Sequence, residues 1–161
     1  MPIIRPNDPT TYTETSDADA VTGTATNVRF SDTGGLTQFG AATETLSPGA
    51  RSSLCHWHQR EDEFVYMLSG QVTVYEGGVA SLLNPGEAVC FKAGVPQGHF
   101  LKNHTDVPAT YLIVGTRLGA DVVTYPDHDR ILTYDDATGT ESFTTLDGTP
   151  GVGSAYRLPG A

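Results

Sequence analysis

The chain has 161 residues and carries 19 acidic against 9 basic side chains, a formal net charge of −10. This length is that of a single domain, and it buries enough surface to fold without a disulfide or a structural metal ion. The acidic surface repels phosphate groups, which makes nucleic acid and anionic membranes unsuitable partners.

Residues 1–35 are rich in Thr, Asp and Ala and poor in large apolar side chains. This composition favours either a floppy tail or an arm that pairs with the edge of a β-sheet, including the edge of a second subunit. Pairing of this kind protects an exposed edge strand. We therefore predict an N-terminal arm over residues 1–35 and a homodimer built on strand pairing.

The middle of the chain, residues 36–118, consists of short segments rich in β-branched and aromatic residues. Many of the 18 Gly and 10 Pro residues fall between these segments, which is typical of an all-β fold with many turns. Strands are predicted near 63–68, 71–76, 88–91 and 109–116. In 71–76, Val72 and Val74 share one face of the strand, and no 3.6-residue periodicity calls for a helix.

Two histidines in this region, His56 and His58, are two residues apart, so on a strand they project from the same face. Glu63 follows after four polar residues, enough to turn the chain and bring its carboxylate beside the two imidazoles. Val65 and Met67 share the parity of Glu63 and should point into the fold as an apolar wall.

A third imidazole, that of His99, comes from a more distant strand and would complete a set of three nitrogen ligands and one oxygen ligand. Such a mixed set suits one divalent transition metal ion (Fe, Mn, Zn, Ni or Cu) better than Ca or Mg, which prefer oxygen ligands. Four protein ligands leave room for water or substrate on a six-coordinate ion. The predicted metal ligands are therefore His56, His58, Glu63 and His99.

The last part of the chain, residues 119–161, is again rich in turns and is expected to be an extension that packs on the middle region. Two cysteines are too few for a secreted disulfide scaffold. Cys55 and Trp57 alternate with the two histidines and should face away from the metal, and Cys90 lies on an apolar strand expected in the core. No apolar run is long enough for a signal peptide or a membrane span, so we expect a cytoplasmic protein.

These motifs resemble those of the cupin superfamily, over residues 36–117. The first cupin motif has a Gly, five residues, His-x-His, three or four residues, Glu, six residues and Gly. This sequence fits it, except that six residues follow the first Gly, with Gly49, His56, His58, Glu63 and Gly70. The resemblance implies a single-domain cupin barrel, also called a jelly roll or double-stranded β-helix, of the small bacterial kind without a settled activity.

The second cupin motif departs from the usual pattern. Gln97 stands where the His is usual, and His99 comes two residues later, although the step from His99 to Asn103 is kept. Two extra residues preserve strand parity, and a turn around Pro96 can absorb them. We favour His99 as the fourth ligand, with Gln97 and His104 as the alternatives.

The resemblance leaves three function classes open, because a fold does not fix a function. The protein is expected to act on a small polar metabolite, as a metal-dependent oxygenase or as an isomerase, epimerase or lyase. The alternative is a non-catalytic module that binds or senses a sugar or a carboxylate. The spacing of residues identifies no general acid or base, although Gln97, Phe100 and Tyr111 are candidate pocket residues.

Overall fold

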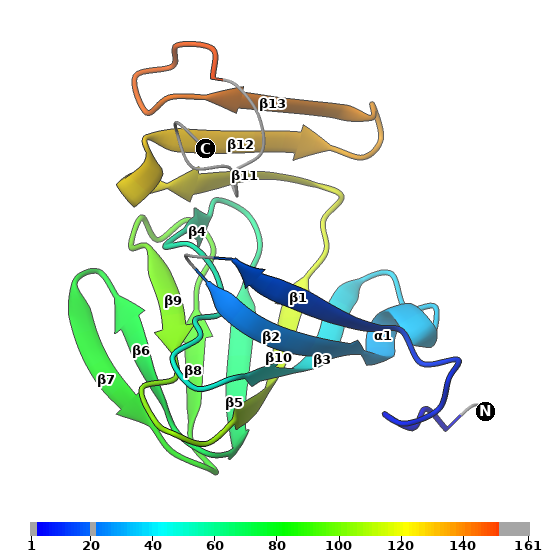
Figure 1. The fold of residues 1–161 in the computed structure, drawn as a ribbon. Coiled ribbons are helices and arrows are strands. Elements are labelled where there is room, and N and C mark those ends of the chain that lie inside the picture. Colours follow the sequence, from blue (N-terminus) through cyan, green and yellow to red (C-terminus); the bar gives the residue numbers. More distant parts are fainter. Residues whose placement is uncertain (1–2, 20–21, 152–161) are drawn as a thin grey trace.

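The computed structural model of the chain describes residues 3–19 and 22–151, and within them it is built almost entirely of strands (Figure 1). The strands are β1 (Thr13–Asp19), β2 (Gly23–Arg29), β3 (Phe39–Leu46), β4 (Trp57–His58), β5 (Glu63–Ser69), β6 (Val72–Glu76), β7 (Val79–Leu83), β8 (Ala88–Phe91), β9 (His99–Lys102), β10 (Ala109–Thr116), β11 (Ala120–Tyr125), β12 (Arg130–Asp135) and β13 (Thr140–Thr144). A four-residue helix α1 (Phe30–Thr33) and a 3₁₀ turn η1 (Pro126–His128) complete the described elements. The all-β prediction is confirmed, and β5, β6, β8 and β10 lie where strands were predicted.

The strands form three antiparallel sheets. Six strands make one sheet in the order β1-β2-β3-β10-β5-β8, and three make a second in the order β7-β6-β9. The third sheet has the order β13-β12-β11-β4 and lies across one end of the other two (Figure 1).

The core fills the space between the first two sheets, and strand alternation decides which residues enter it. On β5, Val65 and Met67 are 1% and 0% exposed, as their parity with Glu63 predicted. On β6, Val72 and Val74, predicted to share one face of the strand, are both buried. Other buried members of this core are Ala25, Leu46, Ala50, Leu83, Phe91, Leu101, Ala109 and Tyr111.

The turn after β5 depends on a glycine. Gly70 has a φ of +74°, a conformation that other residues rarely adopt. A Cβ at this position would also lie 2.7 Å from the carbonyl oxygen of Pro108. The turn at this residue of the first motif therefore requires glycine both for its backbone conformation and for lack of space.

The N-terminal segment is an arm whose second strand pairs with β3 of the same chain. The register places Asn27 of β2 opposite Glu44 of β3, and Arg29 opposite Ala42. The sequence left open a floppy tail or an arm that pairs with a sheet edge, and in the structure β2 pairs with the edge of β3. The homodimer stays a prediction, because the edge that this arm covers belongs to its own chain.

The C-terminal segment extends the fold through β4. Strand β11 pairs with β4 in a register that puts Val123 opposite His58 and Thr124 opposite Trp57. A second apolar cluster lies beneath this sheet, formed by Leu54, Val123, Tyr125, Leu132, Tyr134 and Phe143. Residues 152–161, the end of the predicted extension, lie outside the described residues, and the three-part division of the chain stays a prediction.

One prediction about the core is wrong, because Cys90 is exposed. The pairing of β5 with β8 sets Phe91 opposite Glu63 and Cys90 opposite Phe64, so the odd-numbered residues of β8 face inward and Cys90 faces outward. The four-residue run 88–91 is apolar on both faces and does not reveal its own parity. Cys55 is partly buried, and burial raises the pKa of its thiol to about 11.

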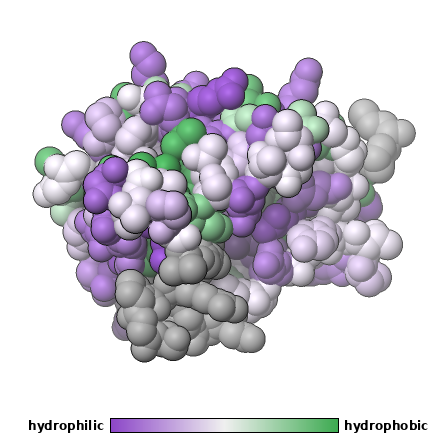
Figure 2. Space-filling view, turned by 90° about the horizontal axis from the view of Figure 1, so that it is seen from above, coloured by the Kyte–Doolittle hydropathy of each residue, from purple (hydrophilic) through white to green (hydrophobic). Residues whose placement is uncertain are grey.

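Hydrophilic side chains cover most of the surface in the view of Figure 2, with a small group of apolar residues between them. Among the described residues, no helix has the length and apolar character needed to cross a membrane.

Candidate metal centre

The four predicted ligands meet between the two main sheets. His56 forms an antiparallel bridge with His99 at the start of β9, His58 ends β4, and Glu63 begins β5. The ring centroid of His56 lies 5.0 Å from the ring centroid of His58 and 5.0 Å from that of His99. The Nε2–H of His99 donates to Oε2 of Glu63 at 2.8 Å, and Nε2 of His58 lies 4.0 Å from the same oxygen.

The spacing of the donor atoms fits a single ion. One donor atom from each of His56, His58 and Glu63 lies within 4.8 Å of the others. The donors are imidazole nitrogens and a carboxylate oxygen, the set preferred by Fe, Mn, Zn and Ni. Metal binding by these residues stays a prediction. The spacing and the chemistry of the donor atoms are those that a metal site requires.

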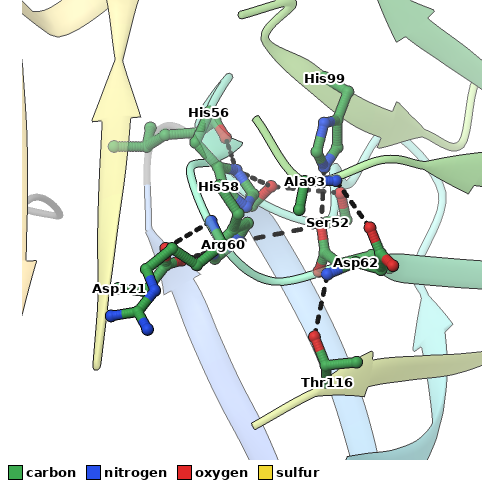
Figure 3. A network of polar contacts seen from close by, with 12 residues as sticks. Ser52, His56, His58, Arg60, Asp62, Ala93, His99, Thr116 and Asp121 are labelled. Atoms are coloured by element: carbon green, nitrogen blue, oxygen red, sulfur yellow. Dashed lines mark hydrogen bonds and ion pairs between the residues drawn. The ribbon is translucent and has the colours of Figure 1, made fainter. Parts of the chain in front are cut away.

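The Nδ1 atoms of two of these histidines are engaged by acceptors on the chain. Nδ1 of His56 is 2.8 Å from the carbonyl oxygen of Leu54, and Nδ1 of His58 is 2.6 Å from Oδ2 of Asp121 (Figure 3). A carbonyl or carboxylate oxygen can only accept, so each Nδ1 carries the proton. Each Nε2 therefore keeps a free lone pair, as a metal ligand must.

Electrostatics favour the protonation states that ligation needs. Burial, with the neighbouring imidazoles, lowers the pKa of His56 to about 4 although Glu63 raises it, so the ring is neutral at pH 7. Burial alone would raise the pKa of Glu63. The hydrogen bond from His99 and the charges of the three histidines outweigh this effect and lower that pKa to about 2. Ligation through His99 would release its Nε2 proton.

The third ring is fixed by stacking. His99 lies face to face with Phe91 of β8, with ring centroids 3.7 Å apart and an interplanar angle of 3°. This contact, together with the hydrogen bond to Glu63, orients the imidazole.

Asp121 of β11 is a site residue that the sequence analysis missed. Its side chain is 0% exposed, and its second oxygen, Oδ1, accepts the backbone N–H of Arg60 at 2.9 Å. A buried carboxylate behind a metal-binding histidine fixes the tautomer and orientation of the ring. The available signal was a lone acid in the apolar run 120–125, but its partner lies 63 positions away in the sequence.

Asp62 holds the turn that delivers Glu63 (Figure 3). Its Oδ1 accepts the N–H of Ala93 at 2.7 Å, and its own N–H donates to Oγ1 of Thr116 at 2.9 Å. These bonds connect three segments: the start of β5, the loop after β8 and the end of β10. The position of Glu63 therefore depends on all three.

Of the alternative fourth ligands, Gln97 lines a small hollow together with His58 and His99, and His104 lies against Tyr75. The side chain of Gln97 is exposed, and His104 is exposed with its Nε2 3.0 Å from the hydroxyl of Tyr75. A tight turn, in which the N–H of Gln97 donates to the carbonyl of Val95 at 2.8 Å, takes up the two extra residues. The structure thus places the His99 imidazole in hydrogen-bond contact with Glu63.

Two other residues of the sequence analysis have clear places. Asn103, the last residue of the second motif, is fully buried and donates to the carbonyls of Leu46 and Val107, so its role is to hold a loop. Phe100 stacks on Tyr75 outside the core at a centroid distance of 4.7 Å, away from the centre.

A hollow of about 200 Å³ borders Glu63 on the side of the N-terminal arm. Small residues such as Gly40, Ala42 and Gly115 leave this space open. Two guanidinium groups line it: Arg29, paired with Glu14 at 2.7 Å, and Arg117, paired with Asp32 at 2.6 Å. A small ligand in this hollow would lie beside Glu63, one of the four candidate metal ligands.

Comparisons with known proteins agree with this architecture. Residues 42–115 match the family described as the Cupin domain. The chain is similar to a crystal structure of a sugar phosphate isomerase from a cupin superfamily, from Silicibacter pomeroyi, with 39% identity, coverage of 84% of this chain and 83% of that one, and a TM-score of 0.74. It is also similar to a candidate sugar phosphate isomerase from Acidithiobacillus ferrooxidans, with 27% identity, 81% and 82% coverage and a TM-score of 0.74.

A structure from Thermotoga maritima, described as a predicted oxalate decarboxylase, is 19% identical over 72% of this chain and 99% of that one, with a TM-score of 0.60, and shows only the shared fold. No curated protein matches the sequence.

Proposed function

The chain belongs to the cupin superfamily, and from this premise we propose that it is a metal-dependent isomerase of small phosphorylated sugars. The observation that carries the proposal is the convergence of three imidazoles on Glu63, because Glu63 also lines a hollow that holds two guanidinium groups. The similarity to proteins named as sugar phosphate isomerases supports the choice of reaction and substrate.

His56, His58, Glu63 and His99 would hold one divalent ion in this centre. Bound there, such an ion supplies Lewis acidity that polarises a carbonyl or hydroxyl oxygen. The chain itself contributes the orientation of the ligands: Leu54 and Asp121 fix the rings from behind.

The guanidinium groups of Arg29 and Arg117 would bind the phosphate of the substrate. Guanidinium groups match phosphate oxygens in a bidentate geometry. Their present partners, Glu14 and Asp32, are exposed or partly exposed carboxylates, and exposed ion pairs of this kind are weak enough to exchange for a phosphate.

The test is a turnover assay. The purified protein is loaded in turn with Mn, Fe, Zn or Ni under argon and incubated with aldose and ketose phosphates and with the corresponding unphosphorylated sugars. Interconversion of an aldose phosphate and its ketose, followed by NMR and abolished in Glu63→Gln, is the expected result.

Two other outcomes would overturn the proposal. Oxygen uptake with Fe(II) and no reaction under argon would assign an oxygenase. Tight binding of a sugar or carboxylate without turnover under any of these conditions would assign a binding or sensing module.

A further inference from the structure

Glu44 of β3 is a buried ionisable side chain that the candidate metal centre does not use. The described residues include three buried acidic or histidine side chains, and two of them, His99 and Asp121, belong to that centre. Glu44 is 7% exposed and lies in the barrel interior. Burying a carboxyl group costs free energy, and such groups gather at functional sites.

Neutral hydrogen-bond donors hold this carboxyl group in place. Strand register sets Glu44 directly between Asn27 of β2 and Tyr111 of β10. The hydroxyl of Tyr111 donates to Oε2 of Glu44 at 2.5 Å, and the Asn27 side chain also hydrogen-bonds to it. The carboxyl group is therefore oriented, but no positive charge neutralises it through these bonds.

Glu44 also reaches open space. It lines a hollow of about 430 Å³ between the arm and the barrel, together with Arg51 and Ser52. Asn27 and Arg29 line both this hollow and the one beside Glu63, so the two spaces adjoin. A ligand that extends from Glu63 along β2 would come to Glu44.

We propose that Glu44, oriented by Tyr111, is the general base and acid of the isomerisation, a role that rests on the proposed function. The substrate class is a 2-hydroxyaldehyde phosphate and its ketose isomer. Asn27 and Arg29, which connect the two hollows, would position this substrate between Glu63 and Glu44.

The proton transfers balance without a further reactant. The Glu44 carboxylate takes the proton from C2, the C2–H electron pair becomes the C1=C2 bond, and the carbonyl pair moves to the C1 oxygen. The proton of the C2 oxygen passes to the C1 oxygen, the C2 carbonyl forms, and Glu44 returns its proton to C1. The ketose leaves with the same atoms as the aldose, and Glu44 is again a carboxylate.

The surroundings of Glu44 suit this role. Burial raises its pKa to about 7, although the bonds from Tyr111 and Asn27 lower it in part, and the charge of Glu63 adds to the rise. A base is most effective when its pKa lies near the working pH. Burial, with the charge of Glu44, raises the pKa of Tyr111 well above its usual value, so the phenol stays a donor. The titratable or charged groups that face Glu44 or its hollow are Glu14, Arg29, Arg51, Glu63 and Tyr111.

The test compares the metal-loaded wild type with Glu44→Gln, Tyr111→Phe and a control, Glu87→Gln, which makes the same chemical change on an exposed turn. Glu44→Gln should lower kcat at least about 100-fold with little change in KM or metal content. It should also stop the incorporation of solvent deuterium at C1 of the ketose.

The pH profile is a second test. In the wild type, kcat/KM should fall as pH drops below about 7. Tyr111→Phe removes a bond that stabilises the carboxylate, so it should move this acid limb to higher pH, a shift that a merely structural role would not cause.

The possible failures are distinguishable. If the wild type isomerises sugar phosphates and Glu44→Gln keeps its kcat within about threefold, this inference is wrong and the proposed function stands. If Glu44→Gln does not fold, the pH profile of Tyr111→Phe decides instead. An acid limb at the same pH as in the wild type would then overturn the inference. If the wild type isomerises none of the sugars, both fall together.

Discussion

The two ends of the barrel interior differ in chemistry although the same strands build them. At one end, Glu63 of β5 meets three imidazoles; four residues further along the same face, Met67 is fully buried among apolar side chains. Glu44 and Tyr111 lie level with Met67, across the sheet. The strand period is the same throughout, so side-chain choice alone makes one end a candidate metal centre and sets the Glu44 carboxyl group beside apolar side chains at the other.

The two interior carboxyl groups sharpen this comparison. The pKa of Glu63 is lowered to about 2 and that of Glu44 is raised to about 7. Both are buried, and the difference comes from their partners: a hydrogen bond from His99 and two further imidazoles for Glu63, a phenol and an amide for Glu44. Two carboxyl groups with separated pKa values can perform different tasks at one pH.

The largest effect on stability is expected at the Met67 end. Met67→Ala should lower the free energy of unfolding by about 3–5 kcal/mol, because it leaves a cavity in a fully buried position. Urea unfolding measures this change. Metal affinity should stay the same, and a large loss of metal binding in the folded variant would contradict the separation of the two ends.

The next effect concerns the pH dependence of stability. Because the folded-state pKa of Glu44 is raised, folding is most favoured while this group is protonated, below about pH 4.5. Stability is lost as pH rises from there to about 7, by about 3 kcal/mol, and is flat above. The Glu44→Gln side chain stays neutral, so this variant should not lose stability between about pH 4.5 and 7 through this group. The difference between its free energy of unfolding and that of the wild type should therefore grow in favour of the variant over this window. A pH-independent difference would show that burial does not shift this pKa.

Removing a ligand should weaken metal binding without unfolding the protein. His99→Ala should lower metal affinity by more than about 100-fold, beyond the range for residues behind the ligands. Gln97→Ala, beside the centre, and His104→Ala, on an exposed position, should weaken metal binding far less. Competition with a chelator measures the three affinities, and a larger loss in Gln97→Ala than in His99→Ala would overturn the four-ligand centre.

A smaller effect is expected behind the centre. Asp121→Asn keeps the shape of the side chain but weakens its hold on Nδ1 of His58, so metal affinity should fall by about 10–100-fold. The absorption spectrum of the Co(II)-loaded protein should change with it, which a loss of packing alone would not produce. An unchanged spectrum and affinity would show that the orientation of His58 does not depend on this carboxylate.

The sequence was sufficient to predict whatever depends on local spacing. Strand parity predicted that Val65 and Met67 point into the core, and the motif spacings predicted that His56, His58, Glu63 and His99 lie together. The side of the strand on which His99 lies was predictable despite the two-residue shift, because an even insertion preserves the face of a strand. That His99 is a metal ligand stays a prediction.

The features that were missed depend on pairing between distant segments. Asp121 meets His58 only because β11 pairs with β4, and Asn27 faces Glu44 only because β2 pairs with β3. Periodicity describes which face a residue occupies, but carries no information about which strand lies next to it. Cys90 shows the complementary limit, since a short run that is apolar on both faces does not define its parity.

The central claim is that the three histidines and Glu63 bind one metal ion. Elemental analysis of the purified protein and of the His56→Ala, His58→Ala double variant tests it most directly, with circular dichroism to show that both are folded. The wild type should contain about one divalent metal ion per chain and the double variant none. Stoichiometric metal in the folded double variant would contradict the claim.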